Sequence, residues 1–339
     1  MKAIGYHASL PIAEDRSLVD LTVPVPVPVP KPRDLLVRVQ AISVNPVDVK
    51  VRANVAPPEG EAKILGWDAA GIVEAVGAEV TAFKPGDAVF YAGAIDRPGA
   101  NSELHAVDAR IVGRKPTSLS FAHAAALPLT AITAWELLFD RLAVPYGTKN
   151  QAGAILIVNG AGGVGSILIQ LARRLTGLTV IATASRPETI AWVKEMGAHH
   201  VIDHRRPLDE GLKEIGIPEV QYVASLSGTD GHLPALVKAV APQGKLALID
   251  DPKTLDIAPF KRKSVSVHWE FMFTRSLFAT ADIAAQHRLL NEVADLVDAG
   301  VLRTTVKDEL GPINAANLRR AHAWLESGKA IGKTVLAGF

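Results

Sequence analysis

The sequence contains no cysteine among its 339 residues. Disulfides, thiol nucleophiles and cysteine-ligated zinc or iron–sulfur sites are therefore excluded. A surplus of charge of one sign is also missing, since 36 Lys and Arg residues against 35 Asp and Glu residues leave a net charge of +1. Such a chain has no overall basic field to attract nucleic acid or an anionic membrane, and we expect neither as a partner.

Long uninterrupted apolar runs are scarce too. The first 16 residues lack the apolar segment of a signal peptide. Two uncharged runs, 116–135 and 150–172, approach the length of a membrane span. The first is broken by two prolines and a histidine, and the second by Asn159 and the four glycines from Gly160 to Gly165. We expect both to be buried elements of a soluble, cytoplasmic protein.

The first part of the chain, residues 1–115, alternates short apolar strands with turns. Strands are expected at 35–44, 71–77, 88–93 and 103–108. Val and Pro alternate from Val23 to Pro30, which predicts an extended or polyproline-like segment. Ser120 is placed to cap a helix that Pro128 interrupts, and a second helix is expected to continue through Trp135 and Phe139.

From residue 153 to about 272, strands alternate with helices, which predicts a parallel sheet with helices on both faces. The expected strands are 153–160, 178–185, 199–203, 220–226, 244–250 and 264–271, and the expected helices are 166–177, 187–197 and 233–241. The tail then has a helix at 281–300, a strand at 303–306, a helix at 313–328 and a strand at 333–338. The pattern alone does not decide whether this tail rejoins the front domain.

The most informative motif is the run Gly160, Ala161, Gly162, Gly163, Val164 and Gly165. It matches G-x-G-x-x-G between a strand and a helix, the context that dinucleotide binding requires. We expect Gly160 to permit the tight turn, Gly162 to let the backbone approach a pyrophosphate, and Gly165 to let helix and strand pack closely. The helix N-terminus would offer N–H groups and its positive dipole end to the phosphates.

The end of the following strand distinguishes between the two nicotinamide dinucleotides. Sites for NAD usually place Asp or Glu there, on the ribose hydroxyls. Here the strand ends in Ser185 and Arg186 with no carboxylate at the tip. A serine hydroxyl and a guanidinium suit a 2′-phosphate, so the sequence predicts NADPH. The alternative is that Arg186 is only a solvated loop charge.

Seven segments together resemble the medium-chain dehydrogenase/reductase superfamily. They are residues 44–52, 66–77, 83–90, 126–138, 159–172, 268–278 and 332–336. Within that superfamily the chain is similar to the quinone oxidoreductases and to the bacterial "zinc-type alcohol dehydrogenase-like" proteins. The resemblance covers essentially the whole chain and is specific to the family but not to a substrate.

The resemblance implies an α/β fold in which a GroES-like β-rich catalytic domain carries an inserted Rossmann domain with a doubly wound parallel sheet. The GroES-like domain is expected at 1–125 plus 273–339, and the Rossmann NADPH-binding domain at 126–272. Relatives pair through the Rossmann sheet edge, so a homodimer is expected.

Zinc-containing relatives carry Cys, His and Glu or Cys ligands, and this chain departs from that pattern. The Gly-His-Glu segment reads Gly66-Trp67-Asp68, and the early cysteine position falls near Ser43–Asn45. Asp68 is therefore expected to be structural rather than catalytic. The only tight histidine cluster, at 199, 200 and 204, lies on a predicted strand and loop rather than one helix face, so we expect no metal site.

The resemblance also assigns substrate and cofactor contacts residue by residue. Asn45 and Lys50 are the expected catalytic residues: Asn45 hydrogen-bonds a carbonyl or the nicotinamide ribose, and Lys50 stabilises an enolate and donates a proton. The alternative for Lys50 is a surface charge. Thr130 is expected near the nicotinamide ring, with a helix-capping hydroxyl as the alternative.

Further cofactor contacts are expected from Ser227, just past one expected parallel strand, from Ile249, at the end of the next, and from Lys333 in the closing Gly-Lys-Thr-Val-Leu. The aromatic run 268–273 forms either core or subunit packing, or a hydrophobic wall for an apolar substrate.

The sequence therefore predicts a zinc-independent, NADPH-dependent oxidoreductase that transfers hydride to quinones or to activated C=C bonds of α,β-unsaturated carbonyls. Two alternatives stay open. One is a metal-free or zinc-dependent alcohol or aldehyde oxidoreductase, and the other is a non-catalytic NADPH-binding protein.

Overall fold

The computed structural model describes residues 1–23, 30–150 and 153–339, which form two compact units. Unit 1 contains Met1–Ile132 and Phe273–Phe339, and unit 2 contains Thr133–Met272. The second of the expected domain boundaries lies at this division, and the first lies seven residues later than expected. Most of the predicted extended segment Val23–Pro30 lies outside the described residues.

Unit 1 is built on two antiparallel-rich sheets, as the turn-punctuated strand pattern predicts. A three-stranded sheet has the order β2-β1-β4, and a seven-stranded sheet has the order β15-β16-β3-β5-β6-β8 with β7 also paired to β3. The strands are β1 (Lys2–Tyr6), β2 (Val19–Thr22), β3 (Asp34–Ser43), β4 (Lys63–Ile64), β5 (Ala69–Val76), β6 (Ala88–Tyr91), β7 (Leu104–Asp108), β8 (Val112–Arg114), β15 (Val306–Glu309) and β16 (Lys333–Ala337).

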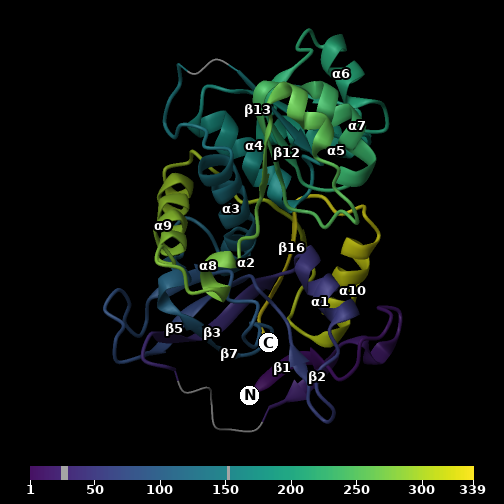
Figure 1. Cartoon of the computed structure of the whole chain (residues 1–339). Helices are drawn as coiled ribbons and strands as arrows, with labels where there is room; N and C mark the ends of the chain where they lie inside the picture. The colour runs from purple at the N-terminus through teal and green to yellow at the C-terminus, as the bar shows by residue number, and fades with distance from the viewer. Residues whose placement is uncertain (24–29, 151–152) are drawn as a thin grey trace. The chain divides into compact units, whose positions relative to one another are not determined.

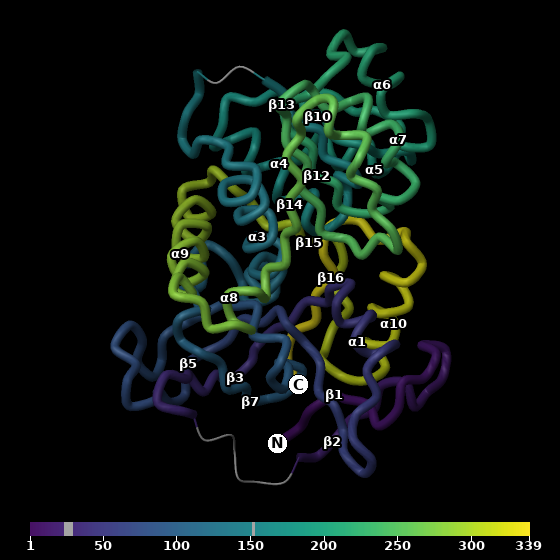
Figure 2. Tube along the Cα trace, viewed as in Figure 1, coloured from purple at the N-terminus to yellow at the C-terminus, as the bar shows by residue number. Residues whose placement is uncertain are grey.

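The tail rejoins the front part of the chain, which answers the question that the sequence left open. β16 pairs antiparallel with β3, so that Val335 lies opposite Ser43. In Figures 1 and 2 the yellow C-terminal strand lies beside the purple and blue strands of unit 1. The helices of this unit are α1 (Pro46–Asn54), α2 (Phe121–Ala125), α8 (Thr274–Leu277), α9 (Ala285–Asp298) and α10 (Ala315–Glu326), with short 3-10 turns at Asp15–Ser17 and Ala109–Ile111.

Unit 2 is a six-stranded parallel sheet with the order β11-β10-β9-β12-β13-β14. Its strands are β9 (Ala154–Val158), β10 (Thr179–Thr183), β11 (His200–Ile202), β12 (Val220–Ser225), β13 (Val240–Leu248) and β14 (Ser266–Trp269). Its helices are α4 (Gly163–Leu175), α5 (Pro187–Met196), α6 (Leu208–Glu214) and α7 (Thr229–Ala239), with a 3-10 turn at Ala258–Lys263. The α/β fold class expected from the sequence is confirmed.

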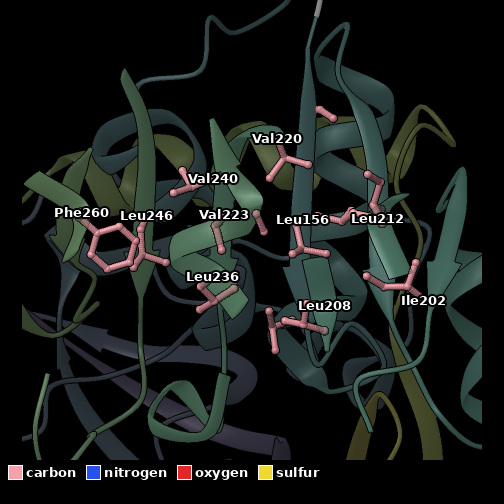
Figure 3. Packing of buried hydrophobic residues seen from close by; sticks show 14 residues of the cluster. Leu156, Ile202, Leu208, Leu212, Val220, Val223, Leu236, Val240, Leu246 and Phe260 are labelled. Carbon is pink, nitrogen blue, oxygen red and sulfur yellow. The ribbon is translucent and has the colours of Figure 1, made fainter. Parts of the chain in front are cut away.

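The strand order places a switch point beside β9. The chain moves outward from β9 to β10 and β11 and then returns to β12 on the other side of β9. Ligands of such sheets bind outside the carboxyl ends of the strands at this point. Figure 3 shows the buried core that fixes these strands, with Leu156, Val223 and Leu246 among its labelled side chains.

Helix α3 (Pro128–Trp135) continues α2 after a break and is followed by a π-helix, η3 (Glu136–Arg141). Ser120 Oγ accepts a hydrogen bond from the His123 backbone N–H, so the predicted cap and the break at Pro128 are both confirmed. The helical run Phe121–Arg141 is long and apolar enough to cross a membrane by length and composition, and 83% of its most apolar window is buried. Core helices of soluble proteins have the same features.

One predicted helix end is confirmed, and the bounds of one other helix and of one strand differ from the prediction. Gly197 adopts the left-handed conformation (φ 114°) that ends α5, as expected. Gly177 does not end α4, because the helix stops at Leu175. The strand expected at 303–306 begins only at Val306, where it pairs with Lys333.

Candidate cofactor and substrate sites

The glycine-rich loop joins the end of β9 to the start of α4 in unit 2. The Asn159 N–H donates to Thr183 Oγ1 (2.9 Å) and the Gly160 N–H donates to the Thr183 carbonyl (3.1 Å). These bonds fasten the loop to the end of β10. The left-handed residue of this turn is Asn159 (φ 62°), so a positive φ is not what requires glycine at position 160.

The three fingerprint glycines meet different constraints. A Cβ on Gly160 would lie 2.8 Å from the Ala182 Cβ, and one on Gly165 would lie 2.5 Å from the Gly160 carbonyl oxygen. Both positions are therefore closed by the protein itself. A Cβ on Gly162 would meet nothing nearer than Asn159 Nδ2 at 3.4 Å, which is ordinary contact. Gly162 is thus the one of the three that the protein leaves open.

The start of α4 fits a dinucleotide pyrophosphate. Gly162, Gly163 and Val164 are partly exposed, whereas Ala161 is buried. The first turn contains no acidic residue that would repel a phosphate, and the helix is 13 residues long. Free N–H groups and the positive end of the helix dipole are therefore available to an anion.

Arg186 and two histidines lie beyond the carboxyl ends of β10 and β11. Arg186 Nε is 3.2 Å from Glu188 Oε1, and both side chains are partly exposed. His204 Nδ1 is 3.3 Å from Thr183 Oγ1, and its ring centroid is 6.5 Å from that of His232. Burial lowers the pKa of His204, and the positive charge of Arg186 lowers it further, so the two groups feel each other's field.

Ser185 and Arg186 were predicted at this point from the sequence, but His204 and His232 were not. Ser185 is half-buried two residues after the end of β10. The signal for His204 was its place two residues past a parallel strand, next to the strand that carries Arg186. His232 gave no such signal, because α7 brings it from a separate part of the sequence.

Ser227 and Ile249 follow the neighbouring parallel strands β12 and β13, and both are half-buried. The Ile249 N–H donates to the Ser225 carbonyl (3.3 Å). Thr229 donates through its N–H and its hydroxyl to the two oxygens of Asp250 (2.9 and 2.6 Å), which fixes the start of α7. The two predicted residues therefore lie at the carboxyl edge of adjacent strands, where the fold places ligands.

A buried polar group in unit 1, here called the Asp68 cluster, consists of Ser43, Asn45, Asp68, the Leu129 N–H and Lys333. Asp68 Oδ2 accepts hydrogen bonds from Ser43 Oγ (2.8 Å), Asn45 Nδ2 (2.8 Å) and Lys333 Nζ (3.0 Å). Its other oxygen accepts from the Leu129 N–H (2.8 Å) at the start of α3. The cluster therefore joins β3, α1, β5, α3 and β16.

Charge balance in this cluster depends on Lys333. Asp68 is fully buried and Lys333 is 3% exposed. A second carboxyl, that of Asp48, is also buried, and burial raises its pKa to about 7 while the charge of Lys333 opposes that rise. Removing one partner of a buried pair costs about 3–5 kcal/mol, because the remaining charge is left uncompensated.

The residues at the zinc-ligand positions of related enzymes do not fit a metal ion. The indole N–H of Trp67 donates to the Ala94 carbonyl (3.1 Å), and its ring packs edge-on against Phe273. An indole nitrogen has no lone pair to offer. Ser43 and Asn45 already donate to Asp68. Across residues 1–23, 30–150 and 153–339, no group of three or more His, Cys, Asp or Glu side chains could hold a metal.

The predicted substrate residues fall into different surroundings. Asn45 is fully buried, and both ends of its amide are hydrogen-bonded within the Asp68 cluster. Lys50 has an exposed side chain on α1. The Thr130 hydroxyl donates to the Leu127 carbonyl (3.1 Å) inside the helix. Asn45 and Lys333 are thus brought together, and the cofactor contacts proposed for Asn45, Thr130 and Lys333 stay predictions.

The run 268–273 alternates between burial and exposure. Trp269 and Phe271 are about half exposed (54% and 47%), whereas Glu270 is buried. Arg141 Nε donates to Glu270 Oε2 (2.9 Å), and burial together with the nearby Glu136 raises the pKa of Glu270 to about 9. The pair of carboxyls formed by Glu270 and by Glu136 of the π-helix was not predicted from the sequence.

Two family models match the chain: "Alcohol dehydrogenase GroES-like domain" over residues 31–120 and "Zinc-binding dehydrogenase" over residues 196–336. A "Zinc-type alcohol dehydrogenase-like protein" of Staphylococcus epidermidis is 38% identical over 338 residues, which cover 99% of each chain. An "NADPH-dependent alkenal/one oxidoreductase, chloroplastic" of Arabidopsis thaliana is 30% identical over 89% of this chain and 71% of its own length.

Solved structures of alcohol dehydrogenase-like proteins and quinone oxidoreductases are also similar to this chain. A Rhizobium etli protein, provisionally described as a zinc-dependent alcohol dehydrogenase, is 57% identical with a TM-score of 0.94 and covers 100% of this chain and 98% of its own. The Escherichia coli quinone oxidoreductase complexed with NADPH is 27% identical with a TM-score of 0.81 over 99% of this chain and 100% of its own. The fold, the glycine-rich loop and these likenesses together show that the chain belongs to the medium-chain dehydrogenase/reductase superfamily of nicotinamide-dependent oxidoreductases.

Proposed function

We propose that this oxidoreductase uses NADPH to reduce quinones or the activated C=C bonds of α,β-unsaturated carbonyls, without a metal ion. The observation that carries the proposal is the closed Asp68 cluster. Direct reduction of a saturated carbonyl gains most from a Lewis acid, whereas a conjugated acceptor spreads the developing charge over a longer system. Two relatives support this substrate class, one described as an alkenal/one oxidoreductase and one as a quinone oxidoreductase.

The choice of NADPH rests on the end of β10. The residues after that strand are Ala184, Ser185 and Arg186, with no carboxylate at the ribose position. Arg186 would hold the 2′-phosphate with its guanidinium, and His204 adds a second nitrogen base to the same side. An acidic side chain at the end of the strand itself would repel the phosphate, and Arg186 would exchange its contact with Glu188 (3.2 Å) for one with the phosphate.

Each of the remaining cofactor residues has a separate task in this proposal. The N–H groups of Gly163 and Val164 hold the pyrophosphate, and Gly162 leaves room for its approach. Ser227 and Ile249 line the nicotinamide side of the sheet edge, with Thr130 near the ring. The bound cofactor supplies the hydride.

On the substrate side, negative charge grows on the carbonyl or quinone oxygen as the hydride arrives. A donor or cation aimed at that oxygen lowers the barrier. Asn45 orients or donates to the oxygen, and Lys50 supplies the positive charge and the proton. The exposed amine of Lys50 is able to exchange its proton with solvent after each turnover.

The deciding experiment is cofactor oxidation with NADPH and NADH against simple enones, enals, quinones, saturated aldehydes and saturated ketones. Each is measured with a chelator and with added zinc, and the products are identified. We expect NADPH-dependent turnover of enones or quinones that ignores the chelator, and its loss in Lys50→Ala. Turnover only of saturated carbonyls, or only with zinc, would show an alcohol or aldehyde oxidoreductase. Tight NADPH binding without turnover would favour the non-catalytic alternative.

We also propose a homodimer that pairs through β14. This strand ends the six-stranded sheet order, and Trp269 on it and Phe271 beside it are half exposed. Sedimentation of the wild type and of Trp269→Lys tests this pairing, since a charge at that edge should shift the protein toward the monomer. An unchanged dimer, or a wild-type monomer, would exclude the edge. The cytoplasmic location stays a prediction.

A further inference from the structure

Lys333 opens β16 and carries a fully coordinated ammonium. Its Nζ atom lies 2.9 Å from the Val44 carbonyl, 2.5 Å from Asn45 Oδ1 and 3.0 Å from Asp68 Oδ2. An ammonium group has three N–H donors, so these acceptors use all of them. With the side chain 3% exposed, this is a positive charge held in a fixed place inside the unit.

The surroundings of this ammonium are the positions at which zinc-containing relatives would hold their ligands. Asn45 lies in the segment of the early cysteine, and Asp68 follows Trp67, which stands in place of the histidine. A metal ion does not fit these side chains. A cation is nevertheless present among them, because Lys333 reaches in from the C-terminal strand.

We propose that Lys333 is a built-in cation that replaces the metal ion of this site and acts as the positioning residue for Asn45. The catalytic part of this inference rests on the function proposed above. Lys333 balances the buried charge of Asp68 and directs the Asn45 amide. It also holds the Val44 carbonyl just before α1, the helix that carries Lys50.

The orientation of the Asn45 amide follows from the two charges beside it. Its oxygen faces the ammonium of Lys333, and its nitrogen faces the carboxylate of Asp68. A flipped amide would set an N–H against the ammonium and an oxygen against the carboxylate. Both contacts would then be repulsive, so the pair of charges selects one orientation. With either charge removed, that selection weakens.

A purely structural ion pair makes a different prediction from a positioning cation. If Lys333 and Asp68 only stabilise the fold, removing both charges together restores stability and activity alike. If Lys333 directs Asn45, removing both charges restores stability but not turnover. The pair of near-isosteric changes Lys333→Met and Asp68→Asn separates the two cases.

The experiment compares the wild type, Lys333→Met, Asp68→Asn and the double variant Lys333→Met/Asp68→Asn. A surface pair, Lys84 (83% exposed) and Asp87 (31% exposed), has its Nζ and Oδ1 atoms 3.7 Å apart and supplies the matched control as Lys84→Met, Asp87→Asn and their double variant. For each protein we would measure zinc content, the unfolding midpoint, the dissociation constant for NADPH, and kcat and KM for the best acceptor.

We expect no bound zinc in the wild type and a large loss of stability in Lys333→Met that the double variant largely recovers. We expect kcat to fall about 10- to 100-fold in Lys333→Met and in the double variant Lys333→Met/Asp68→Asn. This is the range for residues that orient a reacting group. The dissociation constant for NADPH should change little, and the control pair should change nothing. Recovery of kcat together with stability in the double variant would overturn the positioning role.

Two other results would overturn the inference. Weaker NADPH binding with an unchanged kcat would make Lys333 a cofactor contact instead. About one zinc per wild-type chain, lost on Asp68→Asn, would show that the cluster is a metal site. If the wild type reduces no acceptor, the proposed function fails, but zinc content and the stability coupling still decide whether Lys333 is a built-in cation. If no acceptor is reduced, a stability coupling between Lys333 and Asp68 no larger than that between Lys84 and Asp87 would refute the role of Lys333 as a built-in cation.

Discussion

The clearest test of the cofactor site is a comparison of Gly162→Ala with Gly165→Ala. The two glycines lie three residues apart in one motif, yet the protein surrounds them differently. A Cβ at position 165 would lie 2.5 Å from one backbone oxygen and 2.7 Å from another, whereas a Cβ at position 162 has no neighbour closer than 3.4 Å. The first change should damage the fold, and the second should damage only ligand binding.

The magnitudes follow from these contacts. Overpacking against rigid backbone costs about 1–3 kcal/mol or more, so Gly165→Ala should lose a large part of a typical folding stability. Gly162 has φ −72° and ψ 177°, which alanine adopts freely. Alanine lowers the unfolded-state entropy by about 0.4–1 kcal/mol but is a poorer helix cap, so the two effects nearly cancel. Gly162→Ala should therefore fold normally.

The added methyl group at position 162 would occupy the space through which the pyrophosphate approaches the helix N-terminus. We expect the dissociation constant for NADPH to rise about 10- to 100-fold, which corresponds to ~1.4–2.8 kcal/mol. Denaturant unfolding measures the stability of each variant, and cofactor fluorescence titration measures the affinity. Wild-type affinity in a folded Gly162→Ala protein would refute the assignment of the pyrophosphate to this loop.

Three further predictions concern other sites. Arg186→Ala should lower the kcat/KM preference for NADPH over NADH about tenfold. This is the lower end of the range for a charge-assisted hydrogen bond, because the Arg186 side chain is partly exposed. An unchanged ratio would show that Arg186 is only a loop charge. Burial and Glu136 raise the pKa of Glu270 to about 9 from 4.5, so the folded state keeps a proton that the unfolded chain releases, and stability is lost as pH rises from about 4.5 to 9. Glu270→Gln should flatten that fall in melting temperature, whereas a slope equal to that of the wild type would contradict the shift. Burial next to Arg52 lowers the pKa of His322 to about 3 from 6.5, so stability is lost as pH falls from about 6.5 to 3. His322→Leu should reduce this acid sensitivity in pH-dependent unfolding, while the same substitution at His123, a partly exposed histidine beside Glu309, serves as the control.

Much of the fold was predictable because its signals are local. Ser120 caps its helix through the backbone three residues away, and Gly197 ends its helix through its own left-handed backbone. Apolar runs with turn residues between them predicted most of the strands. The glycine fingerprint was equally local, since strand, loop and helix follow one another within about 20 residues. Such signals need no knowledge of the tertiary structure.

The polar sites were harder to predict because their members are far apart in the sequence. Lys333 and Asp68 are 265 positions apart, and Arg141 and Glu270 are 129 apart. A buried charge leaves no pattern in its own neighbourhood, since its partner decides whether it is tolerated. The pairing of β16 with β3 brings Lys333 to the end of the strand that precedes Asn45.

The same reasoning explains why the sequence analysis assigned Lys333 to the cofactor. Its place in the closing Gly-Lys-Thr-Val-Leu resembles a segment that often returns to the cofactor cleft in this family, and that resemblance was the reason for the prediction. The structure shows that its three donors are already bound within unit 1. A lysine in that state stabilises what it touches, and its effect on a reaction must pass through Asn45 and the start of α1. The absence of metal ligands and the presence of this lysine are therefore two aspects of one arrangement, in which the chain supplies its own positive charge.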